Sequence, residues 1–285
     1  MDPQAQLEQV LNFRDVGNTV NKFLGQRRIR EGVFYRSARL DHATSSDRHA
    51  LKDGFGVKTI IDLRSKTEHR EQAAKHQTQY VHLPPDQRPS LQIEGLRYEN
   101  VRITGPAFEK HLARQLSWWN LLKVLFLYIL GYRLQAVSVV SRQVMLPRGL
   151  IGMGLDTLDH SVSEIRQALL LYASAESLPS VIHCTQGKDR TGLVCALLLM
   201  ILDTPLPAIE HDYLLTDAAL VSDRHHRIVE IRQIGLTEDW ADTASEMITK
   251  VSQHISDQYG GLVNYLDHIG VGPEDRARIR ENLLY

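Results

Sequence analysis

Two residues that could do chemistry stand six positions apart in a short polar segment, Cys184 and Arg190. The segment follows Ser180-Val-Ile-His183, which has the pattern of a buried strand, and precedes an apolar helical pattern over 193–202. This order of strand, tight loop and helix predicts an anion-binding cradle, because backbone N–H groups turn inward and the helix dipole adds positive charge. There, a Cys184 thiolate can attack phosphorus in line while the Arg190 guanidinium holds two non-bridging oxygens.

The other positions of this loop also have a use in such a reaction. Gly187 permits the sharp turn with inward amides, and the Thr191 hydroxyl can donate to the sulfur as it leaves. His183 would orient the loop through hydrogen bonds to the backbone, and the amide dipoles with Arg190 should favour the thiolate form of the cysteine. The residues expected to bind the phosphoryl group are Thr185, Gln186, Gly187, Lys188 and Thr191.

Expelling an alkoxide or phenoxide needs a proton donor. Asp189, beside Arg190 on the loop, is the first candidate for this general acid. Asp62, at the end of a predicted strand in Ile61-Asp-Leu-Arg-Ser65, is the second. The alternative role for Asp62 is structural, a carboxylate that ties Arg64 or the loop in place.

Short β-rich segments alternate with longer helical patterns along the chain. The predicted strands are 32–35, 58–62, 80–83 and 180–183. The predicted helices are 46–52, 66–74, a long stretch over 106–145 broken near Gly131, 163–175, 191–202, 206–214, 223–233, 244–259 and 273–284. Strands separated by helices predict an α/β fold with a central, mostly parallel sheet flanked by helices.

A proline-rich stretch, 82–106, precedes an apolar helical block. We therefore expect one domain over 1–285 with a helical lid insertion at about 84–150. The apolar segment 118–130 contains Asn120 and Lys123 and is too short for a transmembrane helix. Three roles stay open for it: packing within the lid, closing over substrate, and peripheral contact with a lipid surface.

The composition excludes several other classes of protein. With 33 Lys and Arg against 34 Asp and Glu, the formal net charge of −1 argues against nucleic-acid binding through bulk electrostatics. Two cysteines cannot make a disulfide framework, the histidines lack metal-ligand spacing, and MDPQAQLEQV does not resemble a signal peptide. We expect no metal and a cytoplasmic location. Cys195 is expected to be core filler on the helix after the loop.

The segment His183-Cys-Thr-Gln-Gly-Lys-Asp-Arg-Thr-Gly192 resembles the HC(X)5RT signature of cysteine-dependent protein tyrosine and dual-specificity phosphatases. The complete motif, HCxxGKDRTG, is similar to that of the atypical branch of this family, which includes bacterial tyrosine and lipid phosphatases and fungal relatives. Further segments agree over nearly the whole chain, although Asn18 stands where a second glycine is usual: 12–17 (NFRDVG), 35–38 (YRSA), 61–65 (IDLRS) and 259–266 (YGGLVNYL).

The resemblance implies the fold of these phosphatases, a phosphocysteine intermediate, no cofactor and often a two-helix lid. Arg14, Asp15, Arg36 and Arg64 lie in these further segments, and we expect them to support the loop by ion pairs and backbone bonds rather than to contact substrate. The expected function is metal-independent hydrolysis of phosphomonoesters, with phosphotyrosine, phosphoserine or phosphothreonine in proteins, or phosphoinositides, as substrates. The alternatives are an inactive phospholigand-binding pseudophosphatase and a phosphatase for a small or lipid-like metabolite. A nucleotide-binding loop is disfavoured because GKDRTG lacks its first glycine and its Ser or Thr.

Overall fold

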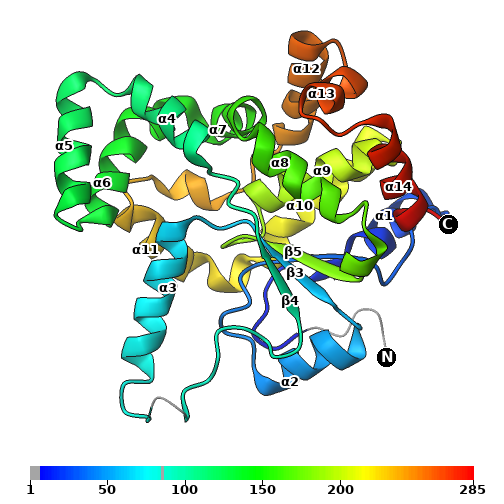
Figure 1. Ribbon diagram of the computed structural model, residues 1–285, viewed down its shortest axis with the longest axis horizontal. Coiled ribbons are helices and arrows are strands. Elements are labelled where there is room, and N and C mark those ends of the chain that lie inside the picture. The colour runs from blue at the N-terminus through cyan, green and yellow to red at the C-terminus, as the bar shows by residue number, and fades with distance from the viewer. Residues whose placement is uncertain (1–6, 85–86) are drawn as a thin grey trace.

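The computed structural model describes residues 7–84 and 87–285, and it contains a five-stranded sheet (Figure 1). The first six residues, and residues 85 and 86 of the predicted excursion, lie outside this range. The strand order is β1-β2-β5-β3-β4, with β1 antiparallel to β2 and the other pairs parallel. The strands are β1 (Arg14–Asp15), β2 (Phe34–Ser37), β3 (Thr59–Asp62), β4 (Arg97–Asn100) and β5 (Ser180–His183). The predicted α/β class with a mostly parallel sheet is confirmed.

The strand register brings three strand ends together at one edge of the sheet. Ser37 of β2 and Asp62 of β3 both pair with His183 of β5. Because carboxyl ends of parallel strands meet at a common edge, the residues that follow them share one site. Cys184 is the first residue beyond this edge.

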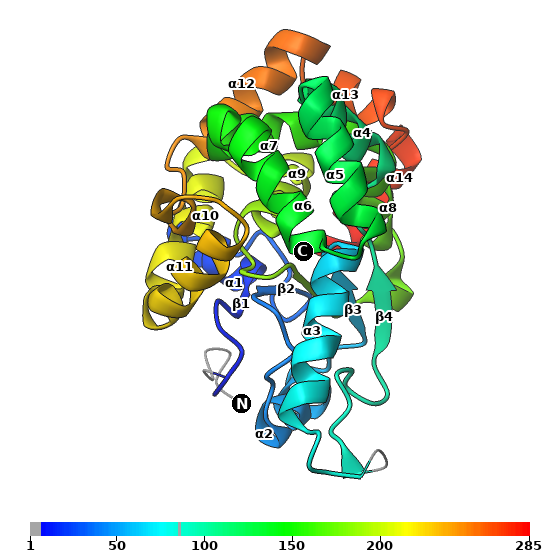
Figure 2. The same cartoon turned by 90° about the vertical axis from the view of Figure 1, so that its left-hand side faces the viewer.

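Helices cover both faces of the sheet and extend beyond it (Figures 1 and 2). They are α1 (Val16–Leu24), α2 (Ser45–His49), α3 (Lys66–Gln79), α4 (Pro106–Gln115), α5 (Trp118–Ile129), α6 (Arg133–Val140), α7 (Leu146–His160), α8 (Val162–Leu171), α9 (Asp189–Ile201), α10 (Leu206–Ala219), α11 (Arg224–Gln233), α12 (Met247–Tyr259), α13 (Leu262–His268) and α14 (Pro273–Leu283). Short π and 3-10 turns continue or connect several of them, including η1 (Ala50–Gly54), η3 (Ser141–Met145) and η6 (Glu238–Ala241).

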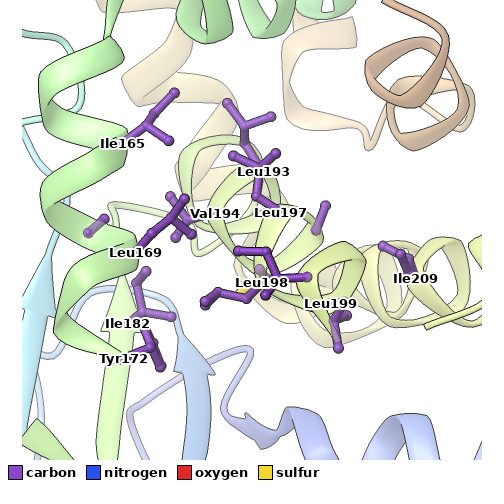
Figure 3. Close-up of a cluster of buried hydrophobic side chains, with 14 of the residues drawn as sticks. Ile165, Leu169, Tyr172, Ile182, Leu193, Val194, Leu197, Leu198, Leu199 and Ile209 are labelled. Carbon is purple, nitrogen blue, oxygen red and sulfur yellow. The ribbon is translucent and has the colours of Figure 1, made fainter. Parts of the chain in front are cut away.

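Helix α9 passes through the centre of the main core. Ten of its residues are buried, so it is apolar all round rather than amphipathic. It packs against Ile165 and Leu169 of α8, Ile182 of β5 and Ile209 of α10 (Figure 3). This packing fixes the N-terminus of α9, and with it the loop that leads into the helix.

The strand predicted over 80–83 is wrong. Residues 80–83 form a turn, with the Leu83 amide bonded to the Tyr80 carbonyl at 3.0 Å, because α3 continues to Gln79. The fourth strand is instead β4, whose sequence Arg-Tyr-Glu-Asn is polar and partly exposed as expected of an edge strand. Since β4 lies within the predicted 84–150 excursion, that stretch includes part of the sheet as well as helices.

The helical block after β4 is divided more often than predicted. It breaks at Leu116, whose backbone is extended, as well as near Gly131, where φ is +83°. Helix α7 was missed because Pro147 and three glycines interrupt its pattern; Gly149, at φ +65°, kinks it. Helices α1 and α13 were also missed. None of the helices in residues 7–84 and 87–285 is long and apolar enough to cross a membrane.

Candidate active site

The loop from Cys184 to Arg190 connects the end of β5 to the first turn of α9. Cys184 is 3% exposed, at the base of the loop. Gly187 has φ +64°, and a Cβ there would lie 2.1 Å from the Ser37 carbonyl oxygen. Glycine is therefore required both by the backbone conformation and by the close approach of β2.

The outer side of the loop is held through its carbonyl groups. Asn12 Nδ2 donates to the carbonyls of Gln186 and Gly187 at 3.1 and 3.0 Å, and Arg36 Nη2 donates to the Gly187 carbonyl at 2.7 Å. Peptide groups whose carbonyls are fixed outward present their N–H groups to the other side. These contacts thus favour an inward-facing ring of amides around the cysteine, suited to an anion.

A buried ion network of Asp212, Arg14 and Arg36 holds the Arg36 side chain in place. Asp212 of α10 accepts from Arg14 Nε at 2.8 Å and from Arg36 Nη1. Burial alone would raise the pKa of the Asp212 carboxyl, but the two guanidinium groups lower it below its usual value. Arg36 therefore contacts the loop directly, at the Gly187 carbonyl, whereas Arg14 is linked to it through Asp212 and Asn12.

Glu68, in the first turn of α3, holds the other end of the loop. Its carboxylate accepts from Arg190 Nη1 at 2.7 Å and from Arg190 Nη2 at 2.6 Å, and also from the Thr185 hydroxyl. Burial alone would raise the pKa of Glu68, but Arg190 and Thr185 hold it well below the usual range. Since both terminal amino groups face Glu68, Nε and its edge of the guanidinium stay available for a phosphoryl group.

The neighbouring side chains of Asp189 and Lys188 differ in exposure: Asp189 is partly open to solvent, whereas Lys188 is buried. The Asp189 side chain is 41% exposed, so a proton can reach it, and its Oδ2 lies 3.8 Å from Lys188 Nζ. Burial and the neighbouring Asp189 carboxylate raise the pKa of Tyr213. Lys188 is 1% exposed and donates to the carbonyls of Trp240 and Asp242 at 2.7 and 2.6 Å. In this arrangement its ammonium group anchors the loop to the η6 segment.

Asp62 is enclosed rather than open to substrate. It is 2% exposed, accepts three hydrogen bonds from the Arg64 side chain at 2.7 to 3.1 Å, and lies 3.5 Å from His183 Nε2. Burial alone would raise its pKa, but His183 and Arg64 hold it well below the usual range. His183 Nδ1 in turn lies 3.1 Å from the Cys184 carbonyl oxygen. These contacts fit the structural role for Asp62.

Three further residues from the sequence analysis are Thr191, Asp15 and Cys195. Thr191 Oγ1 is buried and has no hydrogen-bond partner within the described residues, which leaves it free to donate to sulfur. Asp15 caps α1 by accepting from the backbone amide of Asn18 at 3.1 Å, a contact that any residue except proline could make at position 18. Cys195 is buried among apolar neighbours, and burial raises its pKa to about 12.

A cavity of about 430 Å³ opens beside the loop. Its wall includes Thr185 and Gln186, Arg39 after β2, and His226 and Arg227 of α11. Arg227 Nη1 also donates to Gln186 Oε1 at 3.3 Å. The cavity could receive the group that carries the phosphate. In the described part of the chain, no cluster of His, Cys, Asp and Glu has an arrangement that could hold a metal ion.

Three residues of the site were not among the sequence-based candidates: Asn12, Glu68 and Asp212. The signal for Glu68 was available, because Ser65 and Glu68 form a capping box that fixes the carboxylate at the start of α3, directly after β3. Asp212 had no such signal, since a single aspartate in a helical pattern resembles an ordinary exposed residue.

Comparison with known proteins agrees with this geometry. The sequence profile of the "Tyrosine phosphatase family" matches residues 5–285. The chain is 26% identical over 260 residues to a "Tyrosine-protein phosphatase" of Nostoc commune, covering 88% of this chain and 74% of that protein. It is 24% identical over 296 residues to the "Triple specificity protein phosphatase PtpB" of Mycobacterium tuberculosis, covering 96% of each. The chain therefore belongs to the tyrosine phosphatase family.

Proposed function

We propose that this protein hydrolyses phosphomonoesters through a phosphocysteine intermediate, with phosphotyrosine as the principal substrate. The observation that carries the proposal is the doubly anchored loop. Asn12 and Arg36 hold its carbonyls from outside, and Glu68 fixes Arg190 and Thr185. Donors fixed in advance around a reacting anion stabilise the charge that develops in the transition state.

In the first step, the Cys184 thiolate attacks phosphorus and the ester P–O bond breaks. Asp189 gives its proton to the departing oxygen, while Arg190 Nε and the loop amides bind the equatorial oxygens. The exposure of the Asp189 side chain supports this assignment over Asp62, which Arg64 and His183 enclose.

In the second step, water attacks the phosphocysteine and the S–P bond breaks. The Asp189 carboxylate accepts a proton from the water, which restores the acid for the next cycle. The departing thiolate accepts a hydrogen bond from the Thr191 hydroxyl, whose lack of another partner in the described residues supports this role. Inorganic phosphate then leaves.

The depth of the cysteine supports phosphotyrosine. Cys184 is 3% exposed, so an ester must place its phosphorus at the bottom of the loop. An aryl ester extends further from the protein backbone than a seryl or threonyl ester and can reach this depth more easily. Phosphoserine, phosphothreonine and phosphoinositides are secondary candidates, and the "triple specificity" in the name of one relative supports testing all of them.

The test is phosphate release from matched peptides carrying phosphotyrosine or phosphoserine, and from a short-chain phosphoinositide. We expect the highest kcat/KM on the phosphotyrosine peptide, inhibition by vanadate and no effect of chelator. Cys184→Ser should abolish turnover, whereas Cys195→Ser, at the other buried thiol, should retain it.

Two results would contradict the proposal. Turnover that survives Cys184→Ser would exclude the phosphocysteine route. Phosphate binding without release from any ester would assign the loop to a pseudophosphatase.

A further inference from the structure

Helix α5 presents an apolar surface to solvent. None of its residues is buried, and Trp119, Phe126 and Ile129 are 68%, 62% and 81% exposed. Only its opposite side packs inward, where Leu121 and Val124 contact the cluster around Phe108 and Leu112 of α4. Such a surface on a folded protein marks an interaction site.

Apart from Tyr128, whose ring lies under the Arg133 guanidinium, the exposed apolar residues of α5 and its C-cap Leu130 form one continuous face. At 100° per residue they span roughly 140° of the helix circumference, and Lys123 lies at the edge of this arc. We call this surface the α5 face; it consists of Trp118, Trp119, Leu122, Leu125, Phe126, Ile129 and Leu130. The hairpin of α5 and α6 stands at the outer left of the molecule in Figure 1, away from the sheet.

The segment around this face is strongly basic. Residues 110–155 contain six Lys or Arg and no Asp or Glu, although the whole chain has a net charge of −1. Arg148 is neutralised by Asp156. The other five form no ion pair within the described residues; they are Lys110, Arg114, Lys123, Arg133 and Arg142.

We propose that the α5 face docks on a bilayer surface that contains anionic lipids, with the helix lying in the plane of the interface. Paired tryptophans suit the boundary between headgroups and acyl chains, and the unpaired cations attract anionic headgroups. The 12 residues of α5 extend only about 18 Å, which fits an interfacial position rather than a span.

Charge distinguishes the bilayer from a second copy of this chain. In a symmetric contact, the same basic segment of both copies would meet across the interface, so the cations would repel. An anionic lipid surface removes this repulsion. The proposal concerns binding alone and holds whichever phosphate ester the active site hydrolyses.

The test uses the full chain carrying Cys184→Ser, so that no lipid phosphate can be removed. Flotation with phosphatidylcholine vesicles is compared with flotation with vesicles that also contain about 30% phosphatidylserine, whose negative surface potential should strengthen binding. We expect at least a tenfold higher partition coefficient with phosphatidylserine, reduced by high salt. Two of the three tryptophans lie on the α5 face and Trp240 is buried, so a blue shift and quenching by brominated acyl chains report insertion directly.

The paired change Trp119→Ser with Ile129→Ser should lower the partition coefficient at least tenfold. In the active chain it should leave hydrolysis of a soluble aryl phosphate unchanged, because both side chains are exposed and far from the loop in sequence. The matched control is Val221→Ser with Val263→Ser, at residues 66% and 57% exposed outside α5, which should bind as before.

Three results would overturn the proposal. The first is equal binding of the paired variant and the control. The second is a tryptophan blue shift on adding vanadate without vesicles, which would show that the α5 face closes over the site. The third is a dimer in sedimentation that the paired variant dissociates, which would assign the face to a second copy.

Discussion

The Glu68 carboxylate accepts hydrogen bonds from both terminal nitrogens of Arg190, from Nη2 at 2.6 Å and from Nη1 at 2.7 Å. It thereby sets the orientation of the guanidinium before phosphate binds. The same carboxylate binds the Thr185 hydroxyl near the start of the loop. One side chain from α3 therefore joins the two ends of the anion-binding loop. Because it leaves the Nε edge free, it prepares the arginine for substrate without competing for that edge.

Glu68→Gln should lower kcat/KM about 10- to 100-fold. Glutamine keeps the shape but turns an N–H toward Arg190, and losing a charge-assisted hydrogen bond costs about 1.5–3 kcal/mol. Steady-state kinetics with an aryl phosphate measures the loss. Glu71→Gln, one turn along the same helix and outside every ion pair with the loop, should retain activity. Equal activity of Glu68→Gln and the wild type would show that Arg190 needs no support.

Gly187→Ala should abolish most activity, by at least about 100-fold, since it displaces the amides that bind the phosphoryl group. Gly25→Ala provides the matched control, because Gly25 has nearly the same φ, +65°, with no atom near the site of a new Cβ. That control should lose about 1–2 kcal/mol of unfolding free energy from backbone strain and keep full activity. Kinetics and urea unfolding together separate the two effects; an active Gly187→Ala would contradict the close contact with Ser37.

Asp189→Asn should make the rate depend more steeply on the leaving group. For phenyl phosphate, kcat/KM, which reports the first step alone, should fall about 100- to 10,000-fold, the usual contribution of a general acid. For an ester with a strongly acidic phenol, the loss should be about tenfold or less, since that oxygen leaves without a proton. The comparison variant is Asp62→Asn, which should lose stability and show no such dependence. Equal losses on both esters would remove Asp189 from the acid role.

Lowering the pH should destabilise the fold in two stages. Burial lowers the pKa of His183, and the guanidinium groups around buried Asp212 lower the pKa of its carboxyl. In the unfolded chain the pKa values of His and Asp are about 6.5 and 3.9. The unfolded state therefore takes up more protons on acidification, and the unfolding free energy should decrease below about pH 6.5 and again below about pH 4.

Urea unfolding between pH 7.5 and 3.5 measures this decrease. His183→Gln should reduce the slope between pH 7 and 5, and the remainder comes from His42 and His160, whose pKa values burial also lowers. His225→Gln, at an exposed position, should retain the full slope. A stability that stays constant over this range would contradict the buried, neutral state of His183.

Local sequence patterns correctly predicted the buried central elements of the fold but missed several elements nearer its periphery. The strand at 180–183 and the helix after the loop were found because both are buried and apolar over their whole length. Strand β4 was missed because an edge strand can be polar, and α7 because its glycines hide the helical period. Tertiary contacts determine both elements.

The same division holds within the site. Cys184, Arg190 and Gly187 are close in sequence, so their spacing identified them. Glu68 and Asp212 act on arginines far away in the chain, and only the fold shows which carboxylate meets which arginine. Lys188 shows the opposite limit. Its position in the loop suggested contact with phosphate, while its ammonium group donates to two backbone carbonyls.

The contacts of Asn12 and Arg36 with the loop carbonyls have a consequence for synthesis. These residues leave the ribosome about 150 or more residues before the signature segment, and Asp212 follows later still. The phosphate cradle can therefore take its shape only once the chain through Asp212 has emerged. A nascent chain that ends between Thr191 and Asp212, or a chain clipped at its N-terminus, would carry every reacting group yet lack an ordered anion site.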